Sequence, residues 1–235
     1  MSSNQPVAIV TGAGRGIGRA TAVELASRGY RLVLVARNLD GLNETSNLVG
    51  GALVLAGDVS HNDEVEQVVR NTLSHFGRID ALVNNAGHAP VRSVEQMTIA
   101  EWQVTIDTNL SSIFYFTRLV WPMFKRLGGG VIVNISSLSA RDPLPGFWAY
   151  GAAKAAINLM GLGLAREGAP HNIRVHTVAP GAVETQMMRS VLSHEQLPPE
   201  QALDPSDVAK VIGQCVSGDL KYTSGEVIYV HKTVG

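Results

Sequence analysis

Seven short apolar segments, separated by longer amphipathic ones, constrain the fold of this chain more than any other feature. They lie at residues 7–11, 31–37, 52–59, 81–87, 130–137, 174–181 and 226–231. Several are nearly unbroken runs of valine, leucine, isoleucine and alanine, as in strands that helices cover on both faces. Regular alternation of strand and helix favours right-handed crossovers and a parallel sheet. We therefore expect one α/β domain over residues 1–235, a doubly wound, seven-stranded parallel sheet of the Rossmann type flanked by helices.

Two of the amphipathic stretches show a clear helical pattern. In residues 16–29 one side of the helix carries Ile17, Ala20, Thr21 and Leu25. In residues 60–77 the apolar side carries Val65, Val68, Val69 and Leu73. This spacing is typical of helices that cover a sheet, and Ser60 is expected to cap the second one.

The first apolar segment leads directly into a glycine-rich stretch, TGAGRGIG, from Thr11 to Gly18. Its glycines Gly12, Gly16 and Gly18 stand where a strand is expected to turn into a helix. Such a turn lets a pyrophosphate approach the backbone and rest on the helix N-terminus, where free N–H groups and the helix dipole favour an anion. A tight turn that binds nothing has similar glycines, but the position after the first strand of a βα series favours dinucleotide binding.

Further motifs follow in order along the chain: NNAG at 84–87, DTNLSS at 107–112, NISS at 134–137, YGAAK at 150–154 and APGAVETQM at 179–187. Together with the glycine turn they resemble the short-chain dehydrogenase/reductase family over about residues 7–182. The resemblance resumes weakly in DPSDVAK (204–210) and SGEVIYV (224–230). The family often ends its last strand in Asp-Gly-Gly, whereas this chain reads VHKTVG at 230–235. The resemblance implies an oxidoreductase similar to 3-oxoacyl-acyl-carrier-protein reductases and carbonyl reductases.

The resemblance implies four catalytic residues: Asn109, Ser137, Tyr150 and Lys154. Tyr150 would exchange a proton with the substrate oxygen, although a free phenol has a pKa of about 10. Lys154 lies one helical turn later on the same face, and its ammonium is expected to lower the pKa of that phenol. The residues alone do not choose between Ser136 and Ser137 as donor to the substrate oxygen, and the resemblance implies Ser137. It also implies that Asn109 holds a water connecting Lys154 to solvent.

The end of the second strand bears on the choice of cofactor. An NAD enzyme places an acidic residue there to accept a hydrogen bond from the ribose 2′-OH. This chain has Ala36 followed by Arg37, and Arg15 in the glycine turn is expected to face the same corner. Two arginines without a carboxylate suit a 2′-phosphate, so NADP(H) is the predicted cofactor.

The motifs and the resemblance together imply a larger set of cofactor contacts. These are Gly12, Arg15, Gly16, Ile17, Gly18, Arg37, Asp58, Val59, Asn85, Ala86, Gly87, Tyr150, Lys154, Pro180, Gly181, Val183 and Thr185.

Composition argues against several other classes of function. A formal net charge of −1 provides no basic footprint for nucleic acid or an anionic membrane. No apolar run approaches the ~20 residues of a membrane span, and we see no signal peptide. The single cysteine, Cys215, suits a reducing compartment, and the seven histidines lack ligand spacing, so no metal site is expected. We expect a cytoplasmic protein whose partner is a small-molecule carbonyl or alcohol.

Two stretches are expected to set substrate preference: residues 138–148, which lead to the tyrosine, and residues 183–205, which are expected to form a lid. The presumed pocket wall is mostly apolar, with Phe147, Trp148, Met187, Met188 and Leu192. Arg141 and Arg189 are the candidates for an anion clamp. An apolar ketone, a 3-oxoacyl thioester and a small diketone all fit these residues.

Residues 101–126 carry more apolar surface than one helix needs to cover a sheet, at Ile113, Phe114, Phe116, Val120 and Trp121. With the apolar helix after Tyr150, the resemblance implies a homodimer or homotetramer. The predicted function is NADP(H)-dependent reduction of a carbonyl. The alternative is an NADP-sensing binding protein on the same fold, which would be expected to lose the tyrosine or the lysine. A dehydratase or epimerase would need further acid–base groups that the sequence does not show.

Overall fold

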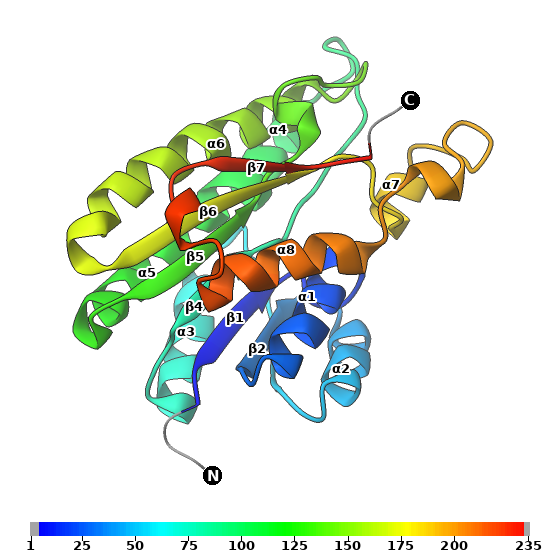
Figure 1. Ribbon diagram of the computed structural model, residues 1–235. Coiled ribbons are helices and arrows are strands. Elements are labelled where there is room, and N and C mark those ends of the chain that lie inside the picture. The colour runs from blue at the N-terminus through cyan, green and yellow to red at the C-terminus, as the bar shows by residue number, and fades with distance from the viewer. Residues whose placement is uncertain (1–4, 233–235) are drawn as a thin grey trace.

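The computed structural model describes residues 5–232 and shows a twisted sheet between two layers of helices (Figure 1). The strands in this range are β1 (Val7–Thr11), β2 (Arg31–Ala36), β3 (Leu53–Ala56), β4 (Ala81–Asn84), β5 (Gly130–Ile135), β6 (Ile173–Pro180) and β7 (Val227–Val230). They form one seven-stranded sheet in the order β3-β2-β1-β4-β5-β6-β7, and every neighbouring pair is parallel. The chain winds outward from β1 in one direction and from β4 in the other. The predicted doubly wound parallel sheet is therefore confirmed.

Helices cover both faces of the sheet. One face carries α1 (Gly16–Ser27), α2 (Leu39–Leu48) and α8 (Pro205–Ser217), and the other carries α3 (Asn62–Phe76), α5 (Ser112–Leu127) and α6 (Trp148–Gly168). α4 (Ile99–Ile106) continues into α5 through a π-helical turn at Asp107–Ser111. The short α7 (Gln186–Arg189) lies in the segment between β6 and α8.

The start of α3 corrects one prediction. The helix begins at Asn62 and its N-cap is His61, which makes no side-chain capping hydrogen bond. Ser60 instead donates from its hydroxyl to the Asp58 carboxylate at 2.7 Å, so the prediction that Ser60 caps this helix is wrong. A serine can bond to a local carboxylate as readily as to a helix terminus, and the sequence does not distinguish the two. Within the helix, Thr72 is buried and Leu73 is only half-buried.

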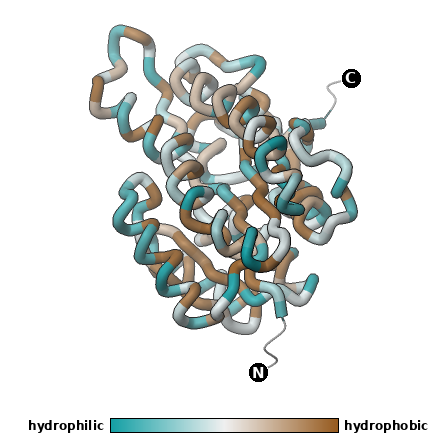
Figure 2. The backbone as a smooth tube through the Cα atoms, turned by 90° about the vertical axis from the view of Figure 1, so that its left-hand side faces the viewer, coloured by the Kyte–Doolittle hydropathy of each residue, from teal (hydrophilic) through white to brown (hydrophobic). Residues whose placement is uncertain are grey.

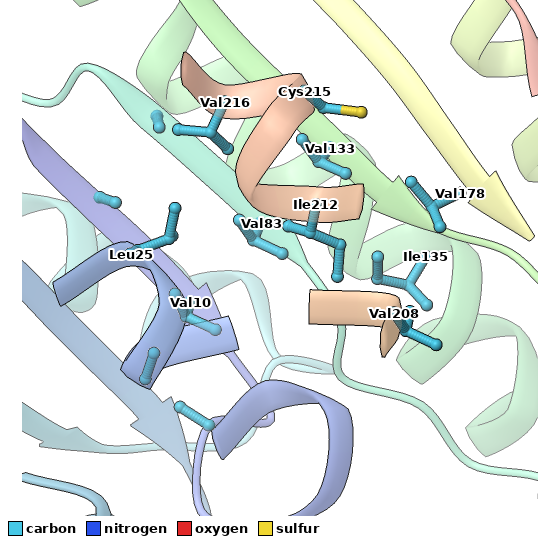
Figure 3. Close-up of a cluster of buried hydrophobic side chains, with 14 of the residues drawn as sticks. Val10, Leu25, Val83, Val133, Ile135, Val178, Val208, Ile212, Cys215 and Val216 are labelled. Atoms are coloured by element: carbon cyan, nitrogen blue, oxygen red, sulfur yellow. The ribbon is translucent and has the colours of Figure 1, made fainter. Parts of the chain in front are cut away.

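Two hydrophobic clusters, one on each face of the sheet, form the core. Figure 3 shows one of them, in which Val10, Val83, Val133 and Val178 of four strands meet α1 and α8. The backbone is correspondingly hydrophobic along the inner strands and mixed along the outer helices (Figure 2). Cys215 is fully buried in this cluster, and burial raises the pKa of its thiol to about 12, so it has no thiolate character at neutral pH.

Because the strands are parallel, their carboxyl ends all lie at one edge of the sheet. The segments that carry the predicted site residues leave from this edge, after each of the strands β1 to β6. The fold therefore brings together residues that are far apart in the sequence. No helix within residues 5–232 is long and apolar enough to cross a membrane, and the same residues contain no cluster of three potential metal ligands.

Candidate active site

The glycine-rich turn between β1 and α1 leaves no room for a side chain at Gly12 or Gly18. Gly12 and Gly16 have φ angles of 63° and 53°, in the left-handed region that favours glycine. A Cβ on Gly18 would lie 2.2 Å from the carbonyl oxygen of Gly12. Arg15, the N-cap of α1, makes no side-chain capping bond, so no side chain of the cap occupies the N–H groups of the first turn. This backbone cradle fits a pyrophosphate, the group that a dinucleotide would place there.

Thr11, which the sequence analysis did not single out, joins this turn to the NNAG segment. Its hydroxyl accepts hydrogen bonds from the backbone N–H groups of Asn85 (2.9 Å) and Ala86 (3.0 Å). The Asn85 side chain returns a bond to the Thr11 carbonyl at 2.8 Å. A polar residue at the end of an otherwise apolar strand was the available signal. Asn85 thus holds the floor of the cradle in place.

The two arginines predicted to bind a 2′-phosphate have different side-chain partners in this structure. Arg37 is 77% exposed, and its guanidinium lies 3.6 Å from the Asp58 carboxylate. Arg15 instead donates to the side-chain oxygen of Gln186 on α7. Burial raises the pKa of Asp58, but hydrogen bonds from Ser60 and the charge of Arg37 outweigh it and hold that pKa below its ordinary value. An ionised carboxylate therefore stands beside Arg37, where the sequence analysis expected none.

The structure separates the roles of the two adjacent serines after β5. Ser136 is buried, and its hydroxyl donates to the carbonyl of Lys154 at 3.1 Å. Ser137 is half-buried, its hydroxyl accepts a hydrogen bond from the Ser139 N–H at 3.1 Å, and it lies near enough to the Tyr150 phenol to lower that group's pKa. Ser136 is therefore committed to holding α6, and Ser137 is the serine that faces the tyrosine.

Tyr150 and Lys154 lie one turn apart on α6. The Lys154 side chain is almost wholly buried, its Nζ donates to the Ile135 carbonyl at 2.7 Å, and it lies 5.4 Å from the centre of the Tyr150 ring. Burial lowers the pKa of Lys154 to about 7. Burial also raises the pKa of Tyr150 to about 12, against the smaller lowering effect of its bond with Ser137. The expected lowering of the tyrosine pKa is thus wrong, because loss of water outweighs the effect of Ser137, and the buried Lys154 itself resists the positive charge that would lower it.

Asn109 lies in the π-helical turn and is fully buried. Its side-chain NH₂ group donates to the carbonyls of His88 (2.7 Å) and Thr105 (2.8 Å), and its oxygen accepts from the His88 N–H at 3.2 Å. A Cβ on Gly87 would lie 3.2 Å from that oxygen and 3.9 Å from the Lys154 Nζ. Asn109 and Lys154 therefore face the same point, and the Asn109 side chain fastens the loop that follows β4.

The remaining predicted cofactor residues divide into half-buried and buried positions. A Cβ on Gly16 would meet the Thr185 methyl group at 3.1 Å, so the segment after β6 reaches the glycine turn. Ile17, Gly87 and Gly181 are half-buried, whereas Pro180 is buried. Val59 and Val183 are buried within the two hydrophobic clusters, so any contact of these two with a cofactor would come through their backbone.

The apolar side chains predicted to line the substrate pocket lie in different surroundings in the structure. The Phe147 ring lies edge-on to Tyr150, with ring centres 6.0 Å apart. Trp148 stacks on Trp102 of α4 at 5.7 Å, away from the tyrosine. Met187 is 37% exposed. An open groove of about 490 Å³ runs between α1 and α8 past Gly16 and Thr185 and does not include the tyrosine. Carboxylates of Glu24, Glu184 and Asp204 line this groove, but none of the four residues predicted to be catalytic does.

Comparison with known proteins bears on this arrangement. The model of the short chain dehydrogenase family matches residues 6–196. The chain belongs to the short-chain dehydrogenase/reductase family. A 3-oxoacyl-acyl-carrier-protein reductase of Staphylococcus epidermidis is 33% identical over 238 residues, covering 95% of this chain and 96% of its own.

Two solved structures of this family are also similar. A 3-ketoacyl-acyl-carrier-protein reductase from Brucella melitensis complexed with NADH has a TM-score of 0.90 at 32% identity, covering 98% of both chains. L-Sorbose reductase from Gluconobacter frateurii, complexed with NADPH and L-sorbose, has a TM-score of 0.88 at 28% identity, with 98% of both chains covered. This short-chain dehydrogenase is accordingly an oxidoreductase that uses a nicotinamide cofactor.

Proposed function

We propose that this short-chain dehydrogenase reduces a carbonyl substrate with NADPH and that Tyr150 delivers the proton. The observation that carries the proposal is the convergence of Ser137, Tyr150 and Lys154 at the carboxyl edge of the sheet, beside the glycine cradle. The cofactor, when bound, supplies the hydride. A 3-oxoacyl thioester, an apolar ketone and a small diketone remain candidate substrates.

The protonation states of the three residues suit this direction of transfer. With a pKa of about 12, the Tyr150 phenol is protonated at neutral pH and can donate to a carbonyl oxygen. Ser137, beside it, can donate a hydrogen bond to the same oxygen and orient it. The pKa of about 7 lets Lys154 both give and accept a proton near neutrality, so it can resupply the tyrosine. When protonated, its charge also favours the phenolate that forms.

The arginines support NADP(H) over NAD(H). Arg37 is exposed near the end of β2, and Arg15 is bonded to a neutral amide, which a phosphate would replace with a stronger, charge-assisted bond. We infer that both bind the 2′-phosphate, and that Asp58 orients Arg37 for it. We also infer that residues 183–205 close over the substrate as a lid.

Substituting Tyr150 tests the catalytic role. Tyr150→Phe should lower carbonyl reduction by at least about 10²-fold, because it removes a positioned general acid and keeps the ring. NADPH affinity, measured by nicotinamide fluorescence, should stay the same. The control is Tyr222→Phe, at a tyrosine that is 90% exposed, and it should leave both unchanged. Near-normal turnover of Tyr150→Phe would revive the alternative of an NADP-sensing binding protein.

Substituting Arg37 tests the cofactor preference. The wild type should bind NADPH more than about tenfold more tightly than NADH, since a hydrogen bond to a charged group contributes about 1.5–3 kcal/mol. Arg37→Asp should reverse this order, whereas Arg70→Asp, at an exposed arginine of α3, should not. Equal affinity of the wild type for both cofactors would contradict the assignment.

The apolar side chains available for an oligomer interface differ from those expected from the sequence. Ile113, Phe116 and Val120 are buried in the core of the single chain, so they leave no surface for a partner. Phe114 on α5 is 55% exposed and Leu159 on α6 is 72% exposed. We infer that these two apolar side chains pair across an interface between two copies of the chain.

A further inference from the structure

The end of β7 lies beside the candidate catalytic serine. The N–H of Gly181 donates to the carbonyl of Val230 at 2.8 Å, which holds the segment after β6 against β7. A Cβ on Gly181 would lie 2.9 Å from the Cβ of His231 and 3.8 Å from the side chain of Leu138. Leu138 directly follows Ser137. His231 therefore lies at the border of the substrate side of the site.

An arginine reaches the same place from another segment. The Arg141 guanidinium lies 5.0 Å from the centre of the Tyr229 ring, a cation–π contact that holds an otherwise exposed side chain. Tyr229 belongs to β7 (Val227–Val230) and His231 directly follows that strand, so Arg141 and His231 both lie at the carboxyl end of β7. Arg141 and His231 thus approach the site together.

Lys232 completes this group. Its Nζ donates to the Glu200 carbonyl in the segment 183–205 at 2.5 Å, which leaves two ammonium protons for other acceptors. We call Arg141, His231 and Lys232 the cationic rim. Among residues 5–232, none of the three has a carboxylate within 4.0 Å, although Asp142 adjoins Arg141 in the chain and Glu200 adjoins Lys232 in space.

Arg189, the other candidate for an anion clamp, already has a carboxylate partner. It pairs with the Glu184 carboxylate and also donates to the carbonyls of Leu192, Ser193 and Leu197. Its hydrogen bonds hold the segment 183–205 in shape. The unpaired charge near Ser137 therefore belongs to the cationic rim.

We propose that the cationic rim binds an anionic group of the carbonyl substrate, either a carboxylate or a phosphate. This group is separated from the substrate's carbonyl by a short chain of atoms. The planar guanidinium of Arg141 matches either anion with two hydrogen bonds, and its contact with Tyr229 reduces the freedom lost on binding. This proposal rests on the proposed function, because it assigns the substrate class of the same site. It predicts that a neutral ketone is a poorer substrate than its charged counterpart.

Steady-state reduction of matched substrate pairs tests the proposal. One pair is levulinate and its methyl ester, and the other is a ketone phosphate monoester and its parent alcohol. The wild type should prefer at least one anion, by about ten- to a hundredfold in kcat/KM and mainly through KM. Arg141→Gln should remove most of that preference, while Arg70→Gln should leave it intact. The pair that shows the preference distinguishes a carboxylate from a phosphate.

Several results separate this proposal from the function on which it rests. Equal kcat/KM for both members of both pairs, or a loss in Arg141→Gln that affects charged and neutral ketones equally, would overturn the cationic rim and leave carbonyl reduction standing. If wild-type protein reduces no ketone, the proposed function fails. Calorimetric titration with the anionic ketones then tests the cationic rim separately. Binding to the wild type that is lost in Arg141→Gln supports the rim, and absence of binding to the wild type refutes it.

Discussion

Replacing Lys154 by methionine should change how the stability of this protein depends on pH. The lysine is 3% exposed, and its Nζ donates a hydrogen bond to the Ile135 carbonyl. Burial lowers its pKa from 10.5 to about 7, which means that the folded protein resists the positive charge. Methionine has a similar shape and carries no charge, so the variant lacks this titration.

The sign and the size follow from the two pKa values. Between about pH 7 and the unfolded-state pKa of 10.5, the unfolded chain binds a proton that the folded protein does not. The contribution of Lys154 to stability is therefore lowest at and below about pH 7 and rises with pH across this window. One proton gives a slope of about 1.4 kcal/mol per pH unit, so the free energy of unfolding should gain about 2 kcal/mol between pH 7 and pH 9.

Urea unfolding followed by tryptophan fluorescence, in the absence of cofactor, measures this effect. Wild type, Lys154→Met and the control Lys125→Met, at an exposed lysine of α5, are compared at about pH 7, 8 and 9. All other ionisable groups are common to wild type and variant, so their contributions cancel in the difference between the two. From pH 7 to pH 9, the free energy of unfolding of the wild type should rise by about 2 kcal/mol relative to that of Lys154→Met. It should not change relative to that of Lys125→Met. A pH-independent difference from Lys154→Met would refute the buried, low-pKa lysine.

Three further outcomes are expected. Gly18→Ala should abolish cofactor binding in a fluorescence titration, because its Cβ would lie 2.2 Å from the Gly12 carbonyl oxygen. The control Gly163→Ala, where a Cβ meets nothing within 4 Å, should stabilise α6 by about 0.5–1 kcal/mol. The pair Phe114→Glu and Leu159→Glu should shift an oligomer to monomer in sedimentation, while Leu48→Glu on α2 should not; a wild-type monomer at micromolar concentration would contradict the interface. Arg189→Ala should speed thermolysin cleavage within residues 190–200, since the arginine holds three carbonyls there; an unchanged cleavage rate would show that the segment keeps its shape without it.

The sequence by itself determined the sheet and the cradle. Strands such as Val7–Thr11 and Gly130–Ile135 are local apolar runs, because a parallel strand is buried on both faces and must be apolar along its length. The glycine turn is equally local: the left-handed backbone of Gly12 and Gly16 requires the residue type that the sequence shows. Where a property depends on a few consecutive residues, the pattern was sufficient.

Only the tertiary structure decided the electrostatics and the partners of the site. Tyr150 and Lys154 are neighbours on one helix, but the direction of their pKa shifts depends on how much water the rest of the fold removes from them. Arg15 bonds to Gln186, 171 residues later, and Arg141 lies over Tyr229 of the edge strand. Such contacts depend on which loops meet at the carboxyl edge of the sheet, and the spacing of residues along the chain does not indicate this. Burial and long-range contact are properties of surfaces brought together by folding, so they arise only with the folded chain.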